Sequence, residues 1–303
     1  MSIINEETDS IREIRCIGEE TPKSWDMDSE DDNEPRSPDA WNVLMDEYSE
    51  GYGYLYLPFL ILGTSVDDED SHPHVLSPPL MESLQSFLPI VISEQNFWMR
   101  YSLLRDGASL DTLLKNIRGA TYTILALETT GGEVFGAFTS SPWSKQVGFF
   151  GNGEAFLWKM RQSRAILTNS IIDQAKLESE IDVYLWNGNN YCVQQCTSTT
   201  ISIGGGSIVE TTQKDDENES PQNETKRDDN MLGLGLAIDK NLLFGTSSSS
   251  ATFDNPPLST EHNDGSPFEI LNLEVWSMTP EMTEEGAIDL ECVKLFLQSN
   301  LGE

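Results

Sequence analysis

The chain has 303 residues, and 18 Lys and Arg against 51 Asp and Glu give it a formal net charge of −33. Nucleic acids and anionic membranes are bound through basic patches, so this charge argues against both and favours a protein partner with basic residues. The four cysteines form no CxxC pair, and no signal peptide or ~20-residue apolar run is evident. The sequence therefore predicts a reduced, intracellular and first of all cytoplasmic protein without a membrane span.

The N-terminal region, residues 1–54, is strongly acidic. Its first 50 residues include 16 acidic and 4 basic ones, and low hydrophobicity with high net charge predicts disorder. Trp41, Leu44, Met45 and Tyr48 are spaced i, i+3, i+4 and i+7, which places them on one helical face. This segment is a short helix that docks on another protein, a helix packed on its own domain, or a nascent helix without a role.

A folded domain is expected over residues 55–280. It begins with an apolar segment at 55–62, whose length suits a buried strand or a chain that lies along the domain. Ser77 and the two prolines after it mark a helix start, because proline is tolerated in the first helical turn. The side chains expected on the buried face of this helix are Leu80, Leu84, Phe87 and Leu88.

Strand and helix signals then alternate. Residues 97–104 carry apolar side chains at period two, which predicts a strand with one apolar face. That face is expected to hold Phe97, Met99, Tyr101 and Leu103. Ser109 can cap the next helix, because apolar residues follow it at i, i+3, i+4 and i+7 from Leu110.

Two hairpins are expected. Strands at 122–128 and 133–138 flank a glycine-containing turn, and strands at 183–186 and 191–196 flank the Asn-Gly turn 187–190. Further strands are expected at 149–150, 155–158, 201–203, 234–238 and 268–276. Many short strands with few helices predict an α+β, mainly β fold, an antiparallel two-sheet β-sandwich flanked by helices.

Two segments complete the predicted organisation. Residues 213–230 contain 7 acidic and 3 basic residues and no apolar one, which predicts a disordered acidic insert in the domain. The chain closes with a helix, signalled over 279–297 and expected as a C-terminal element over 281–303.

Nine segments resemble, in order, the pattern of the TLDc domain family. They are 98–102, 106–113, 134–138, 150–157, 203–206, 234–239, 244–247, 251–253 and 268–276. The resemblance covers residues 77–278. It implies a sandwich of two antiparallel sheets with helices around it, the TLDc fold of the oxidation resistance proteins.

The resemblance also carries functional expectations. It implies protection against oxidative stress, through binding to the peripheral stalk of the vacuolar proton-pumping ATPase and regulation of its assembly, with no catalytic activity or cofactor attached. It adds the mitochondrion and the nucleus as compartments. Some relatives carry a cysteine before a Thr-Phe pair where this chain has Ser250 and Ala251, and the insert 213–230 is longer than in compact members.

Several carboxylates are candidate site residues. Glu154 follows Gly153 and precedes an apolar strand. It either presents a polar group to a partner or for acid/base chemistry, or it fixes the turn by accepting backbone N–H bonds. Glu133, Asp239 and Glu274 have the same two interpretations, and spacing alone pairs none of them into a catalytic dyad.

The other interaction or structural-motif candidates are Trp41, Gly136, Gly151, Gly153, Gly204, Gly205, Gly206, Gly245 and Trp276. The three consecutive glycines at 204–206 lack the Gly-Lys-Ser/Thr of a phosphate loop, so close backbone packing or a bulge is expected there. Cys192 and Cys196 are too far apart on a regular strand for a disulfide. His72 and His74 have no third ligand nearby, so no metal is expected.

The sequence therefore predicts a monomeric, non-enzymatic TLDc interaction module without metal or cofactor, whose partner is a protein. The alternative is a peroxide-reactive or hydrolytic enzyme that uses Cys192, Cys196 or Glu154.

Overall fold

The computed structural model describes residues 58–64, 74–206 and 233–301. The expectations for the acidic region 1–54, for Trp41 and for the insert 213–230 concern residues outside these ranges.

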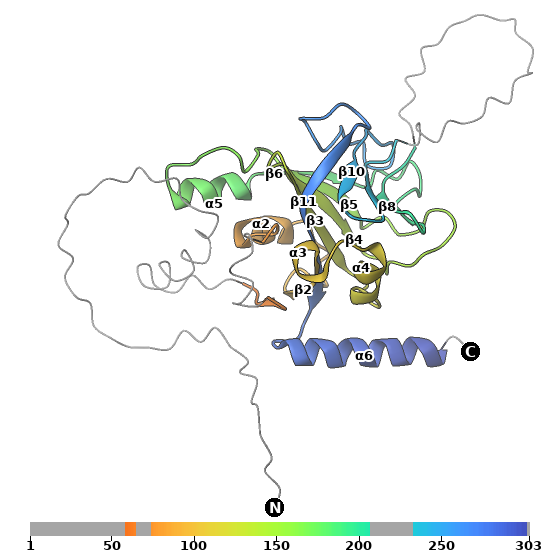
Figure 1. The fold of residues 1–303 in the computed structure, drawn as a ribbon. Coiled ribbons are helices and arrows are strands. Elements are labelled where there is room, and N and C mark those ends of the chain that lie inside the picture. Colours follow the sequence, from red (N-terminus) through yellow and green to blue (C-terminus); the bar gives the residue numbers. More distant parts are fainter. Residues whose placement is uncertain (1–57, 65–73, 207–232, 302–303) are drawn as a thin grey trace, which may run out of the picture. The chain divides into compact units, whose positions relative to one another are not determined.

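The strands form two sheets that share the long strand β11 (Pro267–Thr279), as Figure 1 shows. The first sheet has the order β6-β5-β4-β3-β11-β2-β1, and the second continues from the start of β11 through β10, β9, β8 and β7. All neighbours are antiparallel except β1 and β2, which are parallel. The other strands are β1 Ile61–Leu62, β2 Asn96–Ser102, β3 Thr123–Thr129, β4 Val134–Thr139, β5 Phe156–Met160, β6 Ile181–Leu185, β7 Gln194–Cys196, β8 Thr200–Ile203, β9 Leu236–Asp239 and β10 Phe244–Thr246.

The described residues also form helices α2 Pro78–Gln85, α3 Leu103–Asp106, α4 Leu110–Asn116, α5 Ile171–Ser179 and α6 Glu284–Leu301. Ser109 caps α4 as predicted, because its side chain accepts a hydrogen bond from the N–H of Thr112. Helix α5 was not predicted, since its buried positions are Leu177 and the charged Glu178, which give almost no apolar periodicity. No helix in these parts of the chain is long and apolar enough to cross a membrane.

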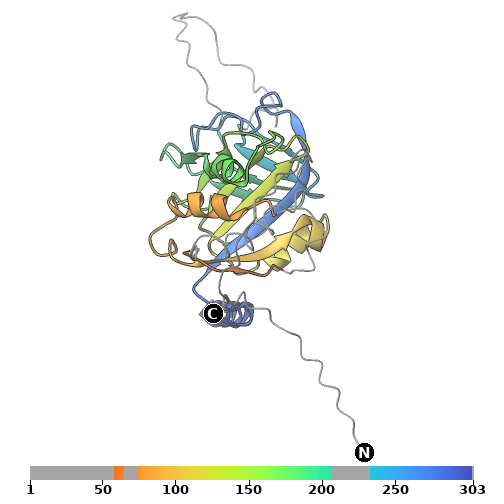
Figure 2. The same cartoon turned by 90° about the vertical axis from the view of Figure 1, so that its left-hand side faces the viewer.

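Both faces of the first sheet are buried. One face packs on the second sheet through a core that includes Leu127, Phe135, Leu157, Ile203 and Ile238. The other face packs under α2 and α5 through a core that includes Leu80, Leu84, Phe156, Trp158 and Leu177. In Figure 1, α2 and α5 lie on one side of β3 and β11, and β8 and β10 on the other; Figure 2, viewed from the helical side, shows α2 and α5 in front of the strands. The predicted mainly β sandwich with flanking helices is confirmed.

Strand β2 does not have the single apolar face that period two predicted. Its pairing with β11 shifts register between Val275 and Trp276, where Tyr101 and Met99 are the partners, so Arg100 is the extra residue of a β-bulge. The bulge turns Phe97 and Met99 toward the helix-covered core, and Tyr101 toward the core between the sheets. A bulge shifts the alternation by one residue, which is why the prediction was wrong.

The expected hairpins have different outcomes. Strands β3 and β4 pair through the turn at 129–132, but β6 and β7 do not pair, and they lie at opposite ends of the strand order. Asn187 instead holds the loop after β6 to another segment, because its N–H donates to the carbonyl of Thr252 and its side chain to that of Ala251.

The helix ends also differ from the prediction. Helix α2 ends at Gln85, and Phe87 beyond it is exposed, so Met81 takes its place on the buried face. Helix α6 begins at Glu284 because β11 continues to Thr279. Its inner side buries Ala287 and Glu291, and Glu291 lies 3.9 Å from Arg100 of β2.

Candidate functional site

Glu274 lies at the centre of a buried polar cluster on the helix-covered face of the first sheet. Strand β11 positions it beside Trp276, two residues along on the same face, and its side chain is fully buried. One carboxylate oxygen accepts hydrogen bonds from the N–H of Val75 (3.0 Å) and from Nδ1 of His74 (3.2 Å). The other accepts from the N–H of Leu76 (3.2 Å) and from Nε1 of Trp276 (2.9 Å). The carboxylate thus holds the backbone at 74–76 against the sheet.

The four donors decide the ionisation of Glu274. Burial alone would raise the pKa of this carboxyl, but the hydrogen bond and charge of His74 and the N–H groups of Val75 and Leu76 outweigh burial and lower the pKa. Glu274 is therefore a carboxylate at neutral pH, with both oxygens bonded. A carboxylate in this state is a poor proton acceptor, so it fixes structure.

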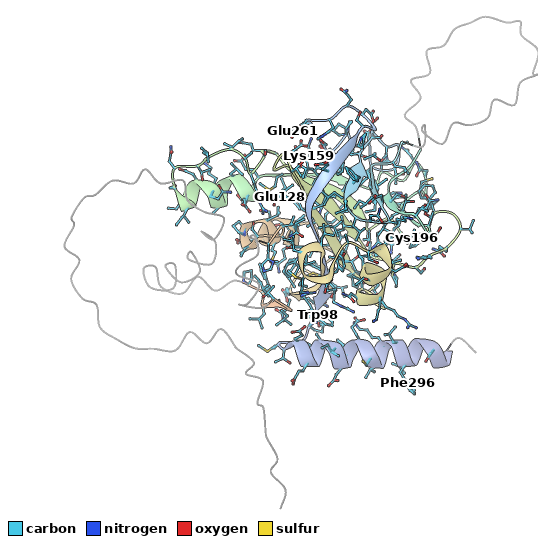
Figure 3. All side chains as sticks on the ribbon, viewed as in Figure 1. Trp98, Glu128, Lys159, Cys196, Glu261 and Phe296 are labelled. Carbon is cyan, nitrogen blue, oxygen red and sulfur yellow. The ribbon has the colours of Figure 1, made fainter. Side chains whose placement is uncertain are left out.

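Arg164, in the loop after β5, supplies the positive charge of the cluster. Its Nη1 donates to Oε2 of Glu128 (2.8 Å), and its Nη2 donates to Oε2 of Glu178 (2.9 Å) and to the carbonyl of Val75 (2.7 Å). Burial would lower the pKa of this guanidinium, but the two carboxylates outweigh burial and raise it. Figure 3 labels Glu128 in this cluster, on the side of the sheet that α2 and α5 cover.

Glu178 of α5 links the cluster to the start of α2. Its Oε2 also accepts a hydrogen bond from the hydroxyl of Ser77, and its Oε1 accepts one from Nε2 of Gln174 (2.9 Å). Sequence reasoning missed Arg164, Glu128 and Glu178, because charged residues on a strand, a loop and a helix are normally solvated. The one available signal was Glu178, which falls one residue after Leu177 on the buried side of a capped helix.

Glu133 fixes a second loop in the same manner. One of its oxygens accepts hydrogen bonds from the N–H (2.6 Å) and the hydroxyl (2.7 Å) of Thr260, and the other accepts one from the hydroxyl of Ser259 (2.6 Å). Leu258, Thr260 and Glu261 also line a small cleft with the start of β4 and the end of β5, and Glu133 and Lys159 belong to the same lining. The cleft therefore contains groups of both charges.

The glycines at 204–206 lie against the loop that follows β10. The hydroxyl of Thr252 accepts a hydrogen bond from the N–H of Gly205 (3.0 Å) and donates to Oδ1 of Asn190 (2.7 Å). Gly204 has φ +79°, which favours glycine, and a Cβ on Gly205 would lie 2.8 Å from that of Cys192. Gly206 accepts from the N–H of Ala251 (2.9 Å). Close backbone packing is thus the role of these glycines.

The remaining glycine candidates have packing neighbours as well. A Cβ on Gly136 would lie 1.9 Å from the carbonyl oxygen of Leu125 on the neighbouring strand, so no side chain fits there. Added Cβ atoms would also meet Gln194 at Gly151, the Trp186 ring at Gly153 and the Phe268 ring at Gly245. Gly136 lies in β4 and Gly245 in β10, whereas Gly151 and Gly153 share the loop before β5.

Comparison with known proteins identifies the family. The model of the TLDc domain family matches residues 70–279, which is more than half of the chain. The chain belongs to the TLDc domain family.

Relatives of this TLDc protein include oxidation resistance proteins. It is 27% identical to oxidation resistance protein 1 of Candida glabrata, over 84% of this chain and 94% of that protein. It is 29% identical to the protein of the same name from Kluyveromyces lactis, over 72% of this chain and 80% of that protein. It is also 27% identical to the Drosophila melanogaster GTPase-activating protein skywalker, but the alignment covers 64% of this chain and only 28% of skywalker.

Two further carboxylate candidates of the TLDc domain lie at the surface or beside a turn. Glu154 is exposed, and the turn is fixed by Asn152, whose Oδ1 accepts a hydrogen bond from the N–H of Glu154 (3.0 Å). The interpretation of Glu154 as the turn-fixing carboxylate is therefore wrong, because the side chain that accepts the backbone N–H in this turn is that of Asn152. Asp239 is the last residue of β9 and fixes the turn that follows, because its Oδ1 accepts a hydrogen bond from the N–H of Leu243 (3.2 Å).

The thiols of the TLDc domain show no sign of activation. Cys192 and Cys196 are free cysteines, and burial raises the pKa of both thiols. A raised pKa lowers the thiolate fraction at neutral pH, and the thiolate is the nucleophile. Figure 3 shows Cys196 on the opposite side of the domain from Glu128. Among the described residues, no three His, Cys, Asp or Glu side chains are grouped so that they could hold a metal ion.

Proposed function

We propose that this chain acts in the cytoplasm as a monomeric, non-enzymatic interaction module in oxidative stress resistance, which binds and regulates the peripheral stalk of the vacuolar proton pump. The names of its relatives support the role in oxidative stress resistance. The two fungal relatives are named oxidation resistance protein 1, and the alignments cover 94% and 80% of their lengths. The family resemblance supports the stalk as partner.

The observation that carries the non-enzymatic part is the bonding of the buried carboxylates. Glu274 accepts four hydrogen bonds and Glu133 three, all from groups of the domain itself. A general base needs a free oxygen within reach of the substrate. Glu274 and Glu133 therefore hold the fold, and binding is left to the surface.

Helix α6 offers the surface for such a contact. On its outer side Val293 and Leu297, four residues apart, are about half exposed, at 55% and 51%. Glu285 and Asp289 precede them on the same i, i+4 row. The pattern fits a helix that lies in an apolar groove of a partner, and the two acidic residues fit basic residues at one end of that groove.

Affinity capture with the full-length protein tests this proposal. Wild-type protein is expected to recover subunits of the vacuolar pump from a cell lysate, identified by mass spectrometry. The double variant Val293→Ser, Leu297→Ser should lose them, because it removes apolar anchors without touching the core. Val147→Ser is the matched control, because Val147 is a fully exposed apolar residue in a loop outside α6. This variant should recover the pump subunits. Recovery that is absent with wild type, or equal with all three proteins, contradicts the proposal.

The alternative, a peroxide-reactive enzyme, makes a different prediction. If Cys192 or Cys196 were reactive, purified wild-type protein would consume hydrogen peroxide faster than the variants Cys192→Ser and Cys196→Ser. We expect equal rates close to the protein-free background, because burial raises the pKa of both thiols. A wild-type rate at least tenfold above that of either variant would show that the thiol takes part.

A further inference from the structure

The outer edge of β6 is an open edge of the first sheet. Strand β6 pairs only with β5, and it is the last strand in the order. The N–H of Arg161 donates to the carbonyl of Glu180, which makes 161 and 180 a hydrogen-bonded pair. Because such pairs alternate along an antiparallel ladder, Asp182 and Tyr184 bond β5, and Ile181, Val183 and Leu185 turn their N–H and C=O groups outward. No hydrogen bond within the described part of the chain satisfies these outward groups.

The edge at β7 is covered, and the edge at β2 is covered in part. Strand β7 exchanges two backbone hydrogen bonds between Gln194 and Phe150, and the N–H of Gln146 donates to the carbonyl of Cys196. Strand β2 is covered in part by β1, and the N–H of Phe97 donates to the carbonyl of Leu60. An uncovered edge is a template for a further strand, so β6 differs from the edges that the fold protects.

The side chains around the open edge suit an extended peptide. Leu185 at the end of β6 is 58% exposed, and Tyr191 in the loop beyond it is 72% exposed. These provide apolar contacts at one end of the edge. At the other end, Glu180 and Asp182 lie beside Arg161, which pairs with Asp182 at 2.8 Å, and Lys159 is the cross-strand partner of Asp182.

We propose that β6 is a docking edge where an extended, basic segment of a partner protein adds a strand to the first sheet. Strand addition supplies backbone hydrogen bonds to Ile181, Val183 and Leu185, and side chains at alternate positions supply specificity. Charge selects the occupant. A second copy of this chain carries a net charge of −33, and the chain's first 50 residues include 16 acidic and only 4 basic ones. Both carry charge of the same sign as this chain and are repelled by it. A basic partner segment carries the opposite charge and is attracted.

Amide-resolved NMR on the full-length protein tests this proposal, with two alternating octapeptides as probes, one of Lys and Val and one of Glu and Val. The Lys–Val peptide is expected to give saturable shift changes and slower hydrogen exchange at Ile181, Val183 and Leu185. The Glu–Val peptide is expected to bind at least about tenfold more weakly. No response to the Lys–Val peptide at millimolar concentration, or equal binding of both peptides, overturns the proposal.

Amide hydrogen exchange in the free protein tests the two other possible occupants of the edge, which are the chain itself and a second copy. The outward amides should exchange fast at every protein concentration. Protection that is independent of concentration means that the edge is covered by the chain itself, and protection that rises with concentration means a second copy; either result overturns the proposal.

The variant Val183→Pro tests the backbone contact directly. It removes an outward N–H that bonds nothing in the sheet, and proline is tolerated at such edge positions. The Lys–Val peptide should bind about fivefold to tenfold more weakly, the change expected for one lost hydrogen bond and a steric clash. Unchanged exchange in β3 verifies the fold. If the variant does not fold, Leu185→Lys replaces it in this test, because Leu185 is an exposed side chain. The added positive charge should lower the affinity for the Lys–Val peptide. Binding that either folded variant leaves unchanged overturns the proposal.

Discussion

Replacing Arg164 by Met is expected to destabilise the protein by about 3–5 kcal/mol, the effect of removing one partner from a buried ion pair. The guanidinium is buried between Glu128 and Glu178 and also bonds the carbonyl of Val75. Its loss leaves two carboxylates close together without a counter-charge and releases the backbone before α2. Urea unfolding of the full-length protein at neutral pH, followed by tryptophan fluorescence, measures the change in the free energy of unfolding.

Arg161→Met is the matched control for this experiment. Arg161 is three residues away and pairs with Asp182 at 2.8 Å, but its side chain is exposed. Exposed ion pairs contribute little because water screens them, so the unfolding midpoint should not move measurably. If Arg164→Met also left the midpoint unchanged, the buried cluster would not be what holds residues 74–77 in place.

The variant Glu274→Gln is expected to destabilise the protein by about 2–4 kcal/mol at pH 7, since each buried donor left unsatisfied costs about 1–3 kcal/mol. Four donors from His74, Val75, Leu76 and Trp276 converge on this carboxylate. A glutamine has one oxygen to offer them, and its NH₂ group would face further N–H donors. The measurement is again urea unfolding, with Glu154→Gln at the exposed carboxylate as the control that should behave as wild type.

The same pair of proteins gives a pH dependence with a definite sign. The pKa of Glu274 is lowered in the folded state, so the unfolded chain binds the proton more readily. The stabilisation by this carboxylate is therefore complete above the unfolded pKa, near 4.3 for an ordinary Glu, and is lost as pH falls through the lower folded value. The difference in unfolding free energy between wild type and Glu274→Gln should shrink as pH falls from 7 toward 3. A difference that grows over this range would contradict the assigned direction.

Elements that depend on local signals could be predicted from the sequence. Ser109 caps α4, and the turn at 129–132 joins β3 and β4, because a cap and a tight turn are each determined by a few neighbouring residues. Long-range events could not be predicted. The bulge at Arg100 and the anchoring of Asn187 to Ala251 and Thr252 depend on segments far away in the chain.

The candidate site shows the same division. Glu133 and Glu274 were recognised as carboxylates with a role, and both are buried and fully bonded. Their partners were missed, since His74, Val75 and Thr260 are distant in sequence and no local pattern links them. Glu154 was misinterpreted because a glycine-flanked turn indicates that some side chain caps it, but not whether this is Glu154 or Asn152.

We propose that this TLDc protein works through a binding surface, while its buried carboxylates hold the fold. The most direct measurement is a binding isotherm between the full-length protein and the purified peripheral stalk of the vacuolar pump. We expect saturable binding that the variant Val293→Ser, Leu297→Ser weakens at least about tenfold, with Val147→Ser binding as wild type. No binding at tens of micromolar, or equal binding by all three proteins, would contradict it.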